Sequence, residues 1–385
     1  MPSVPQSPFS DGAGPRLPEL DTVRGIAILA VTGLHASWPA LAAAPAQSPA
    51  GQIVMAIHLG CGFGVPLFLV VSAVGLSRHY NNPFPGVGGY VAFLMRRAGR
   101  LLPAYVTWSL VTVAILQPER LQSVLGIARV LGNGSADVQF YFVPLIFQLY
   151  LVWPAIRLLV DFTSTSRVCA VATVAVAATV SSGWWKIHDT GMIPQGTWGL
   201  LPLFLVYVCI GVVMAGRVDQ LRALARSRVA IAIVAAATCI AAANMFTGAV
   251  DQIGPHRDGL AVLLAVSIFN VQNMVYSSTA TVLIALLAFR IEGTTGARYL
   301  QKISTRAYGI FLVHMLLLTV VVDPRAVDPG PSTGTAIGPV VTLLIGWTWC
   351  TSAGYALVSL LERVPLLRFA VSNRGLSIFR RGDAA

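Results

Sequence analysis

Long apolar runs follow one another along most of the chain, separated by short polar segments. A helix needs about 17–25 residues to cross a bilayer, and runs of about this length recur throughout the sequence. They cover residues 23–43, 60–77, 101–117, 140–160, 168–185, 199–215, 229–247, 274–290, 307–322 and 338–361. A further apolar stretch at 259–273 leaves room for an extra short or re-entrant segment beside the eighth run. The pattern predicts an all-α bundle of about ten transmembrane helices.

The composition changes this picture only by excluding soluble folds. Hydrophobic residues make up 56% of the 385 residues, and charged residues make up only 11%. A soluble domain carries about 25% charged residues. The mean hydropathy of +0.73 agrees. Most of this apolar surface therefore needs lipid as its solvent.

The basic residues predict the orientation of the bundle. The net charge is +11, but no basic patch interleaved with aromatic residues occurs, so we expect no nucleic-acid partner. With ten spans, 21 of the 26 Lys and Arg residues fall on the side of the N-terminus. The other five are Arg120, Arg129, Lys186, Arg257 and Arg325. Because cytoplasmic loops collect Lys and Arg, this split predicts that both termini are cytoplasmic.

The sequence predicts one domain with a tail at each end. Residues 1–18 are rich in Pro and Ser and lack the apolar core of a signal peptide, so we expect a disordered tail. Residues 19–370 form the predicted transmembrane domain, and residues 371–385 form a basic tail. The five cysteines are widely separated and show no spacing of metal ligands, so we expect no metal site.

The first predicted span contains an arginine and a histidine on one face. Arg24 and His35 are eleven residues apart, which is about 20° from three full helical turns, or about 16 Å along the axis. Asp21, one turn before Arg24, is placed to orient it. A histidine inside a membrane normally faces protein or a water-filled cavity. His35 is either a hydrogen-bonded packing residue or a general base that takes a proton from a hydroxyl group.

The segment around this pair resembles the acyltransferase 3 family, whose members are bacterial integral membrane O-acyltransferases. The resemblance rests on Arg-x10-His within Leu20-Asp21-Thr22-Val23-Arg24-Gly25-Ile26-Ala27. It implies that Arg24 and His35 are the essential catalytic pair. It also implies a multi-pass protein of the bacterial inner membrane.

Two further segments are similar to family motifs in the expected order. Residues 64–72 resemble the motif of the second span, with Ser72 followed by Ala73 in place of the usual Gly. Ser72 is either a substrate contact or a helix hydroxyl bonded to its own backbone. Residues 96–105 resemble the basic segment before the third span and contain Arg96, Arg97 and Arg100. Arginine binds phosphate groups with forked donors, so these three residues are predicted to bind the phosphates of acyl-CoA. Positive-inside topology alone would also account for them.

The remaining motifs lie in the fourth, ninth and last spans. Residues 139–150 resemble a motif that often begins His-x-Trp-Phe, with Gln139 and Tyr141 as departures. Gln148 and Tyr150 in this segment are candidates for substrate binding, although interhelical bonding is the commoner use of such side chains. His314 ends a similar segment in which Phe311 replaces the usual Tyr, and it is either a packing residue or a substrate contact. Glu362 fits the closing pattern and is expected to pair with an arginine.

These residues predict transfer of an acyl group, most simply acetyl, from acyl-CoA to a hydroxyl of a surface or exported glycan. Acyl-CoA is a substrate in this scheme, and no permanently bound cofactor is expected. Direct attack on the thioester and a transient acyl-His35 stay open. An antibiotic or lipid acceptor, a secondary transporter and a non-catalytic scaffold are the alternatives. Transporters often contain paired spans that are broken by Gly or Pro in matching halves of the chain, and the sequence shows no such pair.

Overall fold

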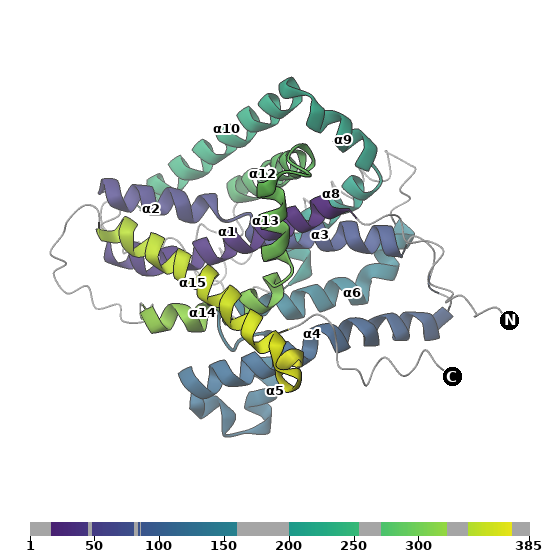
Figure 1. Ribbon diagram of the computed structural model, residues 1–385, viewed down its shortest axis with the longest axis vertical. Helices are drawn as coiled ribbons and strands as arrows, with labels where there is room; N and C mark the ends of the chain where they lie inside the picture. The colour runs from purple at the N-terminus through teal and green to yellow at the C-terminus, as the bar shows by residue number, and fades with distance from the viewer. Residues whose placement is uncertain are drawn as a thin grey trace.

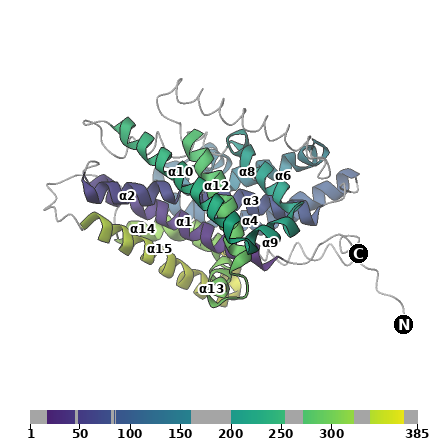
Figure 2. The ribbon, with the colours of Figure 1, turned by 90° about the horizontal axis from the view of Figure 1, so that it is seen from above.

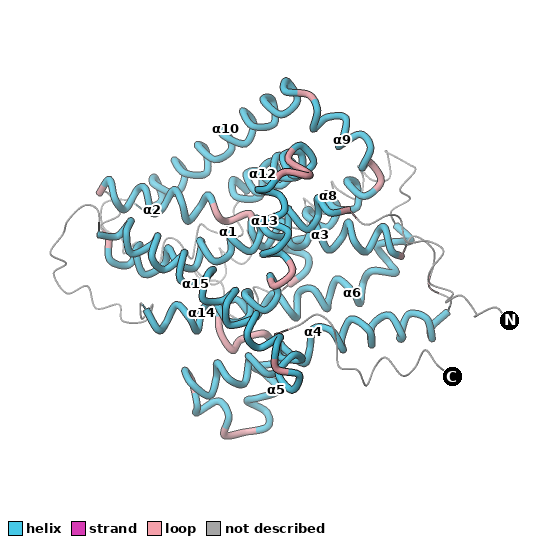
Figure 3. The backbone as a smooth tube through the Cα atoms, in the orientation of Figure 1, coloured by secondary structure: helices cyan, strands magenta, loops and turns pink. Residues whose placement is uncertain are grey.

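The computed structural model describes residues 17–44, 48–80, 84, 86–159, 200–253, 271–321 and 338–371. These residues form helices and turns and no strand (Figures 1 and 3). The longest helices are α1 (Pro18–Ala43), α3 (Gly64–His79), α4 (Gly86–Leu116), α6 (Phe142–Leu159), α10 (Arg228–Ile253), α12 (Val271–Arg290), α14 (Ala307–Val321) and α15 (Gly338–Arg363). The shorter ones are α2 (Pro49–Gly60), α5 (Val124–Asn133), α8 (Leu205–Ala215), α9 (Val218–Arg226) and α13 (Thr295–Ser304). Single 3-10 turns cover Pro118–Leu121 (η1), Val138–Tyr141 (η2), Leu201–Phe204 (η4) and Pro365–Ala370 (η5).

The described part of the chain contains seven helical segments that are long and apolar enough to span a membrane. The number rises to nine if two bent pairs each form one span. These pairs are η4–α8 with α9, bent by 85°, and α13 with α14, bent by 72°. Each of the nine overlaps one of the predicted spans. The predicted span at 168–185 and nearly all of the 259–273 stretch lie outside the described residues, so ten spans and two cytoplasmic termini stay predictions.

Two predicted boundaries are wrong by many residues. The second span was predicted to begin at residue 60, but α2 precedes it, and one apolar segment runs from Pro49 to His79. The third was predicted to begin at residue 101, but α4 begins at Gly86. Its first half contains four glycines and three arginines among apolar residues. These residues lower the mean hydropathy of the segment, but the helix continues through them.

The connection between the third and fourth spans holds a helix that the apolar pattern did not predict. Ser123 begins α5 by accepting a hydrogen bond from the backbone N–H of Gly126, and Gly134 ends it with φ of 65°. Glycine adopts this left-handed conformation without steric cost. Gly132 and Asn133 belong to the last turn of α5.

Helix α1 lies at the centre of the bundle (Figure 1). In its most apolar 18-residue window 72% of the residues are buried, against 17% for α10, which is the most exposed of the spans. It packs against α2, α3, α12, α13, α14 and α15. Gly25 permits one of these contacts, because a Cβ there would clash with the carbonyl oxygen of Leu300 on α13. The helix that carries Arg24 and His35 is therefore held on all sides by protein.

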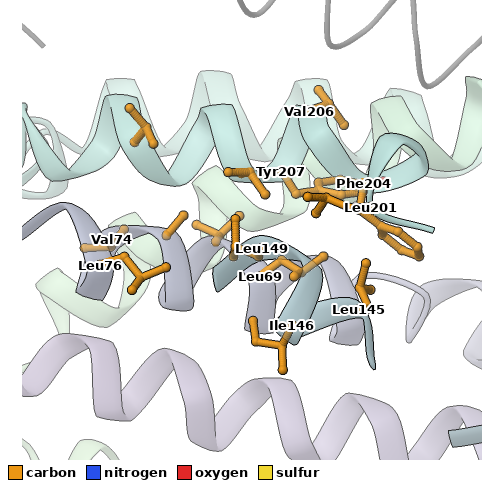
Figure 4. Packing of buried hydrophobic residues seen from close by; sticks show 14 of the residues in the cluster. Leu69, Val74, Leu76, Leu145, Ile146, Leu149, Leu201, Phe204, Val206 and Tyr207 are labelled. Carbon is orange, nitrogen blue, oxygen red and sulfur yellow. The ribbon is translucent and has the colours of Figure 1, made fainter. Parts of the chain in front are cut away.

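A second packing centre joins α3, α6 and α8 (Figure 4). Leu69 and Leu76 from α3, Leu145 from α6, and Phe204 from η4 are almost fully buried there. Ala73 occupies the position of a glycine in the family motif, yet the helices still approach closely. The glycine is on the partner helix, since a Cβ on Gly211 would lie 2.7 Å from that of Ala73.

Four of the five cysteines lie in the described part of the chain. Cys61, Cys209 and Cys350 are buried as free thiols, and Cys239 is exposed. Cys169, residues 1–16 and residues 372–385 lie outside the described part of the chain.

Candidate active site

A cavity of about 650 Å³ opens between α1, α3, α4, α6 and α14. Its polar lining includes Arg24, Arg97 and Arg100, together with Asp21, Ser72, His79, Tyr150, Ser304, Thr305 and Tyr308. Its apolar lining includes Phe68, Phe142 and Phe311. The structure thus brings residues from five of the predicted motifs to one site.

Arg24 and His35 lie on the same side of α1, as predicted. Arg24 faces the cavity opposite the junction of α13 and α14, and its Nη1 donates to Oδ1 of Asp21 at 2.6 Å. His35 contacts His314, farther along α14. The predicted orientation of Arg24 by Asp21 is confirmed. Because the Arg24 side chain is still 38% exposed, it can reach a ligand in the cavity.

The three arginines of the basic segment point in different directions, because they are spread around one turn of α4. Arg97 and Arg100 line the cavity, whereas Arg96 is not among the lining residues. The guanidinium of Arg97 lies 5.7 Å from the Tyr80 ring, 5.6 Å from the Phe93 ring and 5.3 Å from the Tyr150 ring. Such cation–π contacts hold a guanidinium in place without neutralising its charge. Arg97 is therefore preorganised for an anion, and Arg100 is the exposed partner.

Two buried imidazoles form the other polar centre. Nε2 of His314 lies 2.9 Å from Nδ1 of His35, and their ring centroids are 4.9 Å apart. Both rings are buried, and the His35 ring packs edge-on against Trp38 at 5.2 Å. The family resemblance and the spacing in α1 did not predict this contact, because the two residues are 279 positions apart.

The partners of His314 define which nitrogen of His35 carries a proton. Nδ1 of His314 lies 2.8 Å from the carbonyl oxygen of Phe311, which only accepts, so Nδ1 is the donor. For two uncharged imidazoles, Nε2 of His314 then accepts from Nδ1–H of His35. This leaves the lone pair of His35 on Nε2, which has no hydrogen-bond partner among the described residues. A general base needs a positioned, unprotonated nitrogen of this kind.

A proline follows His35 by one turn. Pro39 lies inside α1 and has no N–H to donate, so the carbonyl of His35 lacks its usual helical partner. Proline at such a position bends a helix.

An aromatic layer separates the cavity from the histidine pair. The ring centroids of Phe68 and Phe142 are 5.9 Å apart, and those of Phe142 and Phe311 are 5.4 Å apart. The Phe311 ring lies 6.0 Å from that of His314, one turn farther along α14. All three phenylalanines line the cavity, whereas His35 and His314 do not. The structure therefore places the two histidines directly behind the inner wall of the cavity.

The other predicted substrate residues have mixed positions. Ser72 lines the cavity, and its hydroxyl also donates to the carbonyl of Phe68 at 2.8 Å. Tyr150 lines the cavity and stacks with Arg97. Gln148 does not line the cavity, and its Oε1 accepts a hydrogen bond from the backbone N–H of Leu201 at 3.1 Å. It joins α6 to η4, which is the interhelical role that was the alternative for this residue.

The family model of acyltransferase 3, described as an acyltransferase domain, matches residues 17–352, which is most of the chain. The chain belongs to the acyltransferase 3 family. No curated protein and no solved structure matches the chain. Membership confirms that this is a membrane enzyme that transfers acyl groups other than aminoacyl groups. The predicted enzyme class is thereby confirmed, in preference to a transporter or a scaffold.

The predicted ion pair at the end of this acyltransferase is also present. Oε2 of Glu362 lies 3.0 Å from Nη2 of Arg306, whose Nη1 donates to the Tyr355 hydroxyl at 2.8 Å. This pair joins the end of α15 to the turn before α14. It supports the start of the helix that carries Phe311 and His314.

Two buried polar residues of this acyltransferase were not predicted as site residues. His58 on α2 lies with its Nδ1 2.7 Å from the Ser37 hydroxyl, and its Nε2 has no hydrogen-bond partner among the described residues. Gln139 is 1% exposed, and both of its amide atoms lack partners in the described structure. The sequence signal for Gln139 was its place at the start of a family motif, where it was regarded as a departure.

The 3-10 turn η2, which carries Gln139, packs near the histidine pair. The preceding residue, Val138, packs in one cluster with Trp38, Met315 and Leu318. Trp38 follows His35 by three residues, and Met315 follows His314 directly. A buried amide without partners costs about 1–3 kcal/mol of stability, which a ligand or water that bonds to it can offset. Gln139 is therefore a candidate contact for the acyl carbonyl or the acceptor.

Substitution of Gln139 by methionine, which has a similar shape, is expected to separate stability from activity. Loss of an unsatisfied buried amide should raise the free energy of unfolding by about 1 kcal/mol, while acyl transfer slows about tenfold. Thermal unfolding in detergent and transfer from radiolabelled acetyl-CoA measure the two effects. Gln148→Met is the matched control, because it removes a bonded amide and should lower stability. A Gln139→Met enzyme that is more stable and fully active would exclude the substrate contact.

Proposed function

We propose that the enzyme transfers an acetyl group from acetyl-CoA to a hydroxyl of a surface or exported glycan. The phosphates of the donor bind Arg24, Arg97 and Arg100, and the thioester reaches His35 past the aromatic wall. Nε2 of His35 takes the proton of the acceptor hydroxyl, and its oxygen attacks the thioester carbonyl. The carbon–sulfur bond then breaks, and the thiolate of CoA takes the proton from His35.

The observation that carries this proposal is the hydrogen bond between His35 and His314. It leaves the lone pair of His35 free on one nitrogen, and it holds the ring against rotation. General bases at such positions contribute about 10²- to 10⁴-fold to a rate. The same bond favours His35 rather than His314 as the base, because both nitrogens of His314 already have partners.

The position of the arginines supports a phosphorylated donor. Three guanidinium groups and one carboxylate line the cavity, so its formal charge is positive even with Asp21 included. Arginine binds phosphate with paired charge-assisted hydrogen bonds. Basic residues gather on the predicted cytoplasmic side, where acyl-CoA is made, and an acceptor on the other side would approach the histidine pair from there.

The test compares host cells with and without this chain. Alkali-labile acetyl esters on the surface polysaccharide are measured by mass spectrometry after feeding labelled acetate. The expected result is label in the polysaccharide only when the chain is present. Label that appears instead in extracted lipid or in a secreted small molecule would contradict the glycan acceptor and leave the donor side unchanged.

Arg100→Gln is expected to raise the KM for acetyl-CoA about tenfold and to leave kcat nearly unchanged. The reason is that a charge-assisted bond to phosphate contributes about 1.5–3 kcal/mol, and it acts on binding rather than on the reacting bond. Initial rates at varied acetyl-CoA measure both constants. Arg96→Gln is the matched control, since it removes the same charge from the same turn of α4 outside the cavity. Equal increases in KM for the two variants would show that only the overall charge matters.

A further inference from the structure

A second cavity lies where α9 crosses the end of α12, next to the first turn of α1. Its volume is about 540 Å³, and it is lined by Glu19, Arg222, Ala225, Arg226, Phe289 and Arg290. Figures 1 and 2 show α9, α10 and α12 side by side at this place. None of these residues takes part in the proposed acyl transfer, so the cavity needs a separate explanation.

The lining of this cavity has an excess of positive charge. Three of the six residues are arginines, and Glu19 is the one acid. Arg290 donates from Nη1 to the carbonyl of Ala225 at 3.1 Å, which leaves its other nitrogens free for a ligand. Arg222 lies 3.7 Å from Glu19, and its guanidinium lies over the Phe289 ring at 5.9 Å. Arg226 is exposed and has no ion-pair partner within the described residues. An anionic ligand would therefore be favoured.

Glu19 adds a second, independent requirement. The residue is only 6% exposed, and its Oε2 accepts no hydrogen bond from the described residues. A buried carboxylate oxygen without a donor is costly. A ligand that carries a hydroxyl as well as a negative group would satisfy both Glu19 and the arginines.

The surroundings place this cavity at the level of lipid headgroups. Helix α10 begins at Arg228, two residues after α9 ends, and carries Val229, Ile233 and Ile240 with exposed fractions of 69%, 64% and 71%. Apolar side chains this exposed on a spanning helix face acyl chains. Helix α9 turns by 85° from α8 and buries Val218 and Ala225, as an amphipathic helix in the interface does. The arginines lie at the end of this lipid-facing surface.

We infer that this cavity binds the headgroup of an anionic glycerophospholipid that carries a hydroxyl, such as phosphatidylglycerol. The phosphate contacts Arg222, Arg226 and Arg290, the hydroxyl donates to Glu19, and the acyl chains lie along α10. Basic pockets between spanning helices bind phospholipid headgroups in this way. The bound lipid joins α1, α9 and α12, and so supports the helix that carries Arg24 and His35.

The experiment measures thermal unfolding of the full chain in detergent micelles during titration with dioleoyl-phosphatidylglycerol. The wild type is expected to be stabilised by this lipid and not by dioleoyl-phosphatidylcholine. Arg226→Gln should shift the titration midpoint about fivefold higher, and Arg226→Lys should recover part of the loss. Arg298→Gln, which removes an exposed arginine from α13, is the matched control and should titrate like the wild type.

Four results would overturn this inference. The first is an equal response of Arg226→Gln and the wild type, and the second is an equal loss in Arg298→Gln, which would indicate general charge attraction. The third is full stabilisation by sodium phosphate at matched ionic strength, which would indicate a site for free phosphate. The KM for acetyl-CoA should stay the same in Arg226→Gln, and an increase would assign the cavity to the acyl donor instead. Lipid binding is measured without turnover, so it is judged separately from the proposed reaction.

Discussion

His35→Ala is expected to abolish measurable acyl transfer, with a loss of kcat of about 10³-fold. The substitution removes the one nitrogen of the His35–His314 pair that the hydrogen bonding leaves unprotonated and free, and general-base catalysis contributes about 10²- to 10⁴-fold. The effect should appear in kcat rather than in the KM for acetyl-CoA, because the donor cavity does not include His35. Transfer of radiolabel from acetyl-CoA to an alkali-labile product measures it.

The control for this prediction is His58→Gln. His58 is also a fully buried histidine of the same bundle, but it bonds to Ser37 and not to His314. Both variants should insert and elute as folded protein, and only His35→Ala should lose activity. If a folded His35→Ala enzyme keeps wild-type kcat, His35 is a packing residue and the proposed base is wrong.

The second large effect is expected at His314, where the choice of substitution matters. His314→Leu removes the acceptor for Nδ1–H of His35, so the ring can rotate or take the other tautomer. We expect kcat to fall about 100-fold, which corresponds to about 2.7 kcal/mol, with the KM for acetyl-CoA unchanged. Steady-state rates at saturating acetyl-CoA measure this loss.

His314→Gln tests whether the role of His314 is positioning. A glutamine carbonyl can accept the hydrogen bond from Nδ1–H of His35, so this variant should recover most of the activity that His314→Leu loses. A purely structural role predicts that both variants lose stability and activity together. A direct chemical role for His314 predicts that glutamine fails as badly as leucine, which would exchange the roles of the two histidines.

The aromatic layer of Phe68, Phe142 and Phe311 lies between the cavity and the histidine pair. In the proposed reaction, Phe68, Phe142 and Phe311 separate the arginines of the cavity from His35, so the thioester has to pass them. Rotation of the Phe311 side chain would open the shortest path, because Phe311 precedes His314 by one turn of α14. An apolar wall of this kind would also exclude water and so protect the thioester from hydrolysis.

Much of the site could be predicted from the sequence because its parts lie on regular helices. The eleven-residue spacing of Arg24 and His35 determines that they share a face of α1, whatever packs against it. Asp21 lies one turn from Arg24 and forms the predicted ion pair. The pairing of Glu362 with an arginine was expected from the family pattern, and the structure identifies Arg306 as the partner. The individual roles of Arg24, His35 and the other site residues stay predictions until the variants are measured.

Other features could not be predicted because several helices combine to produce them. The three arginines of α4 look equivalent in the sequence, yet their different directions around the helix put Arg97 and Arg100 in the cavity and leave Arg96 outside its lining. The bends after α8 and before α14 are equally hidden, since hydropathy records length and not direction. The start of α4 was missed because its glycines and arginines lower the local hydropathy without ending the helix.

The sequence by itself determined that this protein is an α-helical membrane protein of the acyltransferase 3 family, because apolar run length and local motif spacing are properties of single segments. Only the tertiary structure decided that His314 contacts His35, and that Gln139 and His58 are buried. Only the structure revealed the cavity around Glu19. A hydrogen bond between residues 279 positions apart depends on how α1 and α14 pack, and no local pattern encodes that contact.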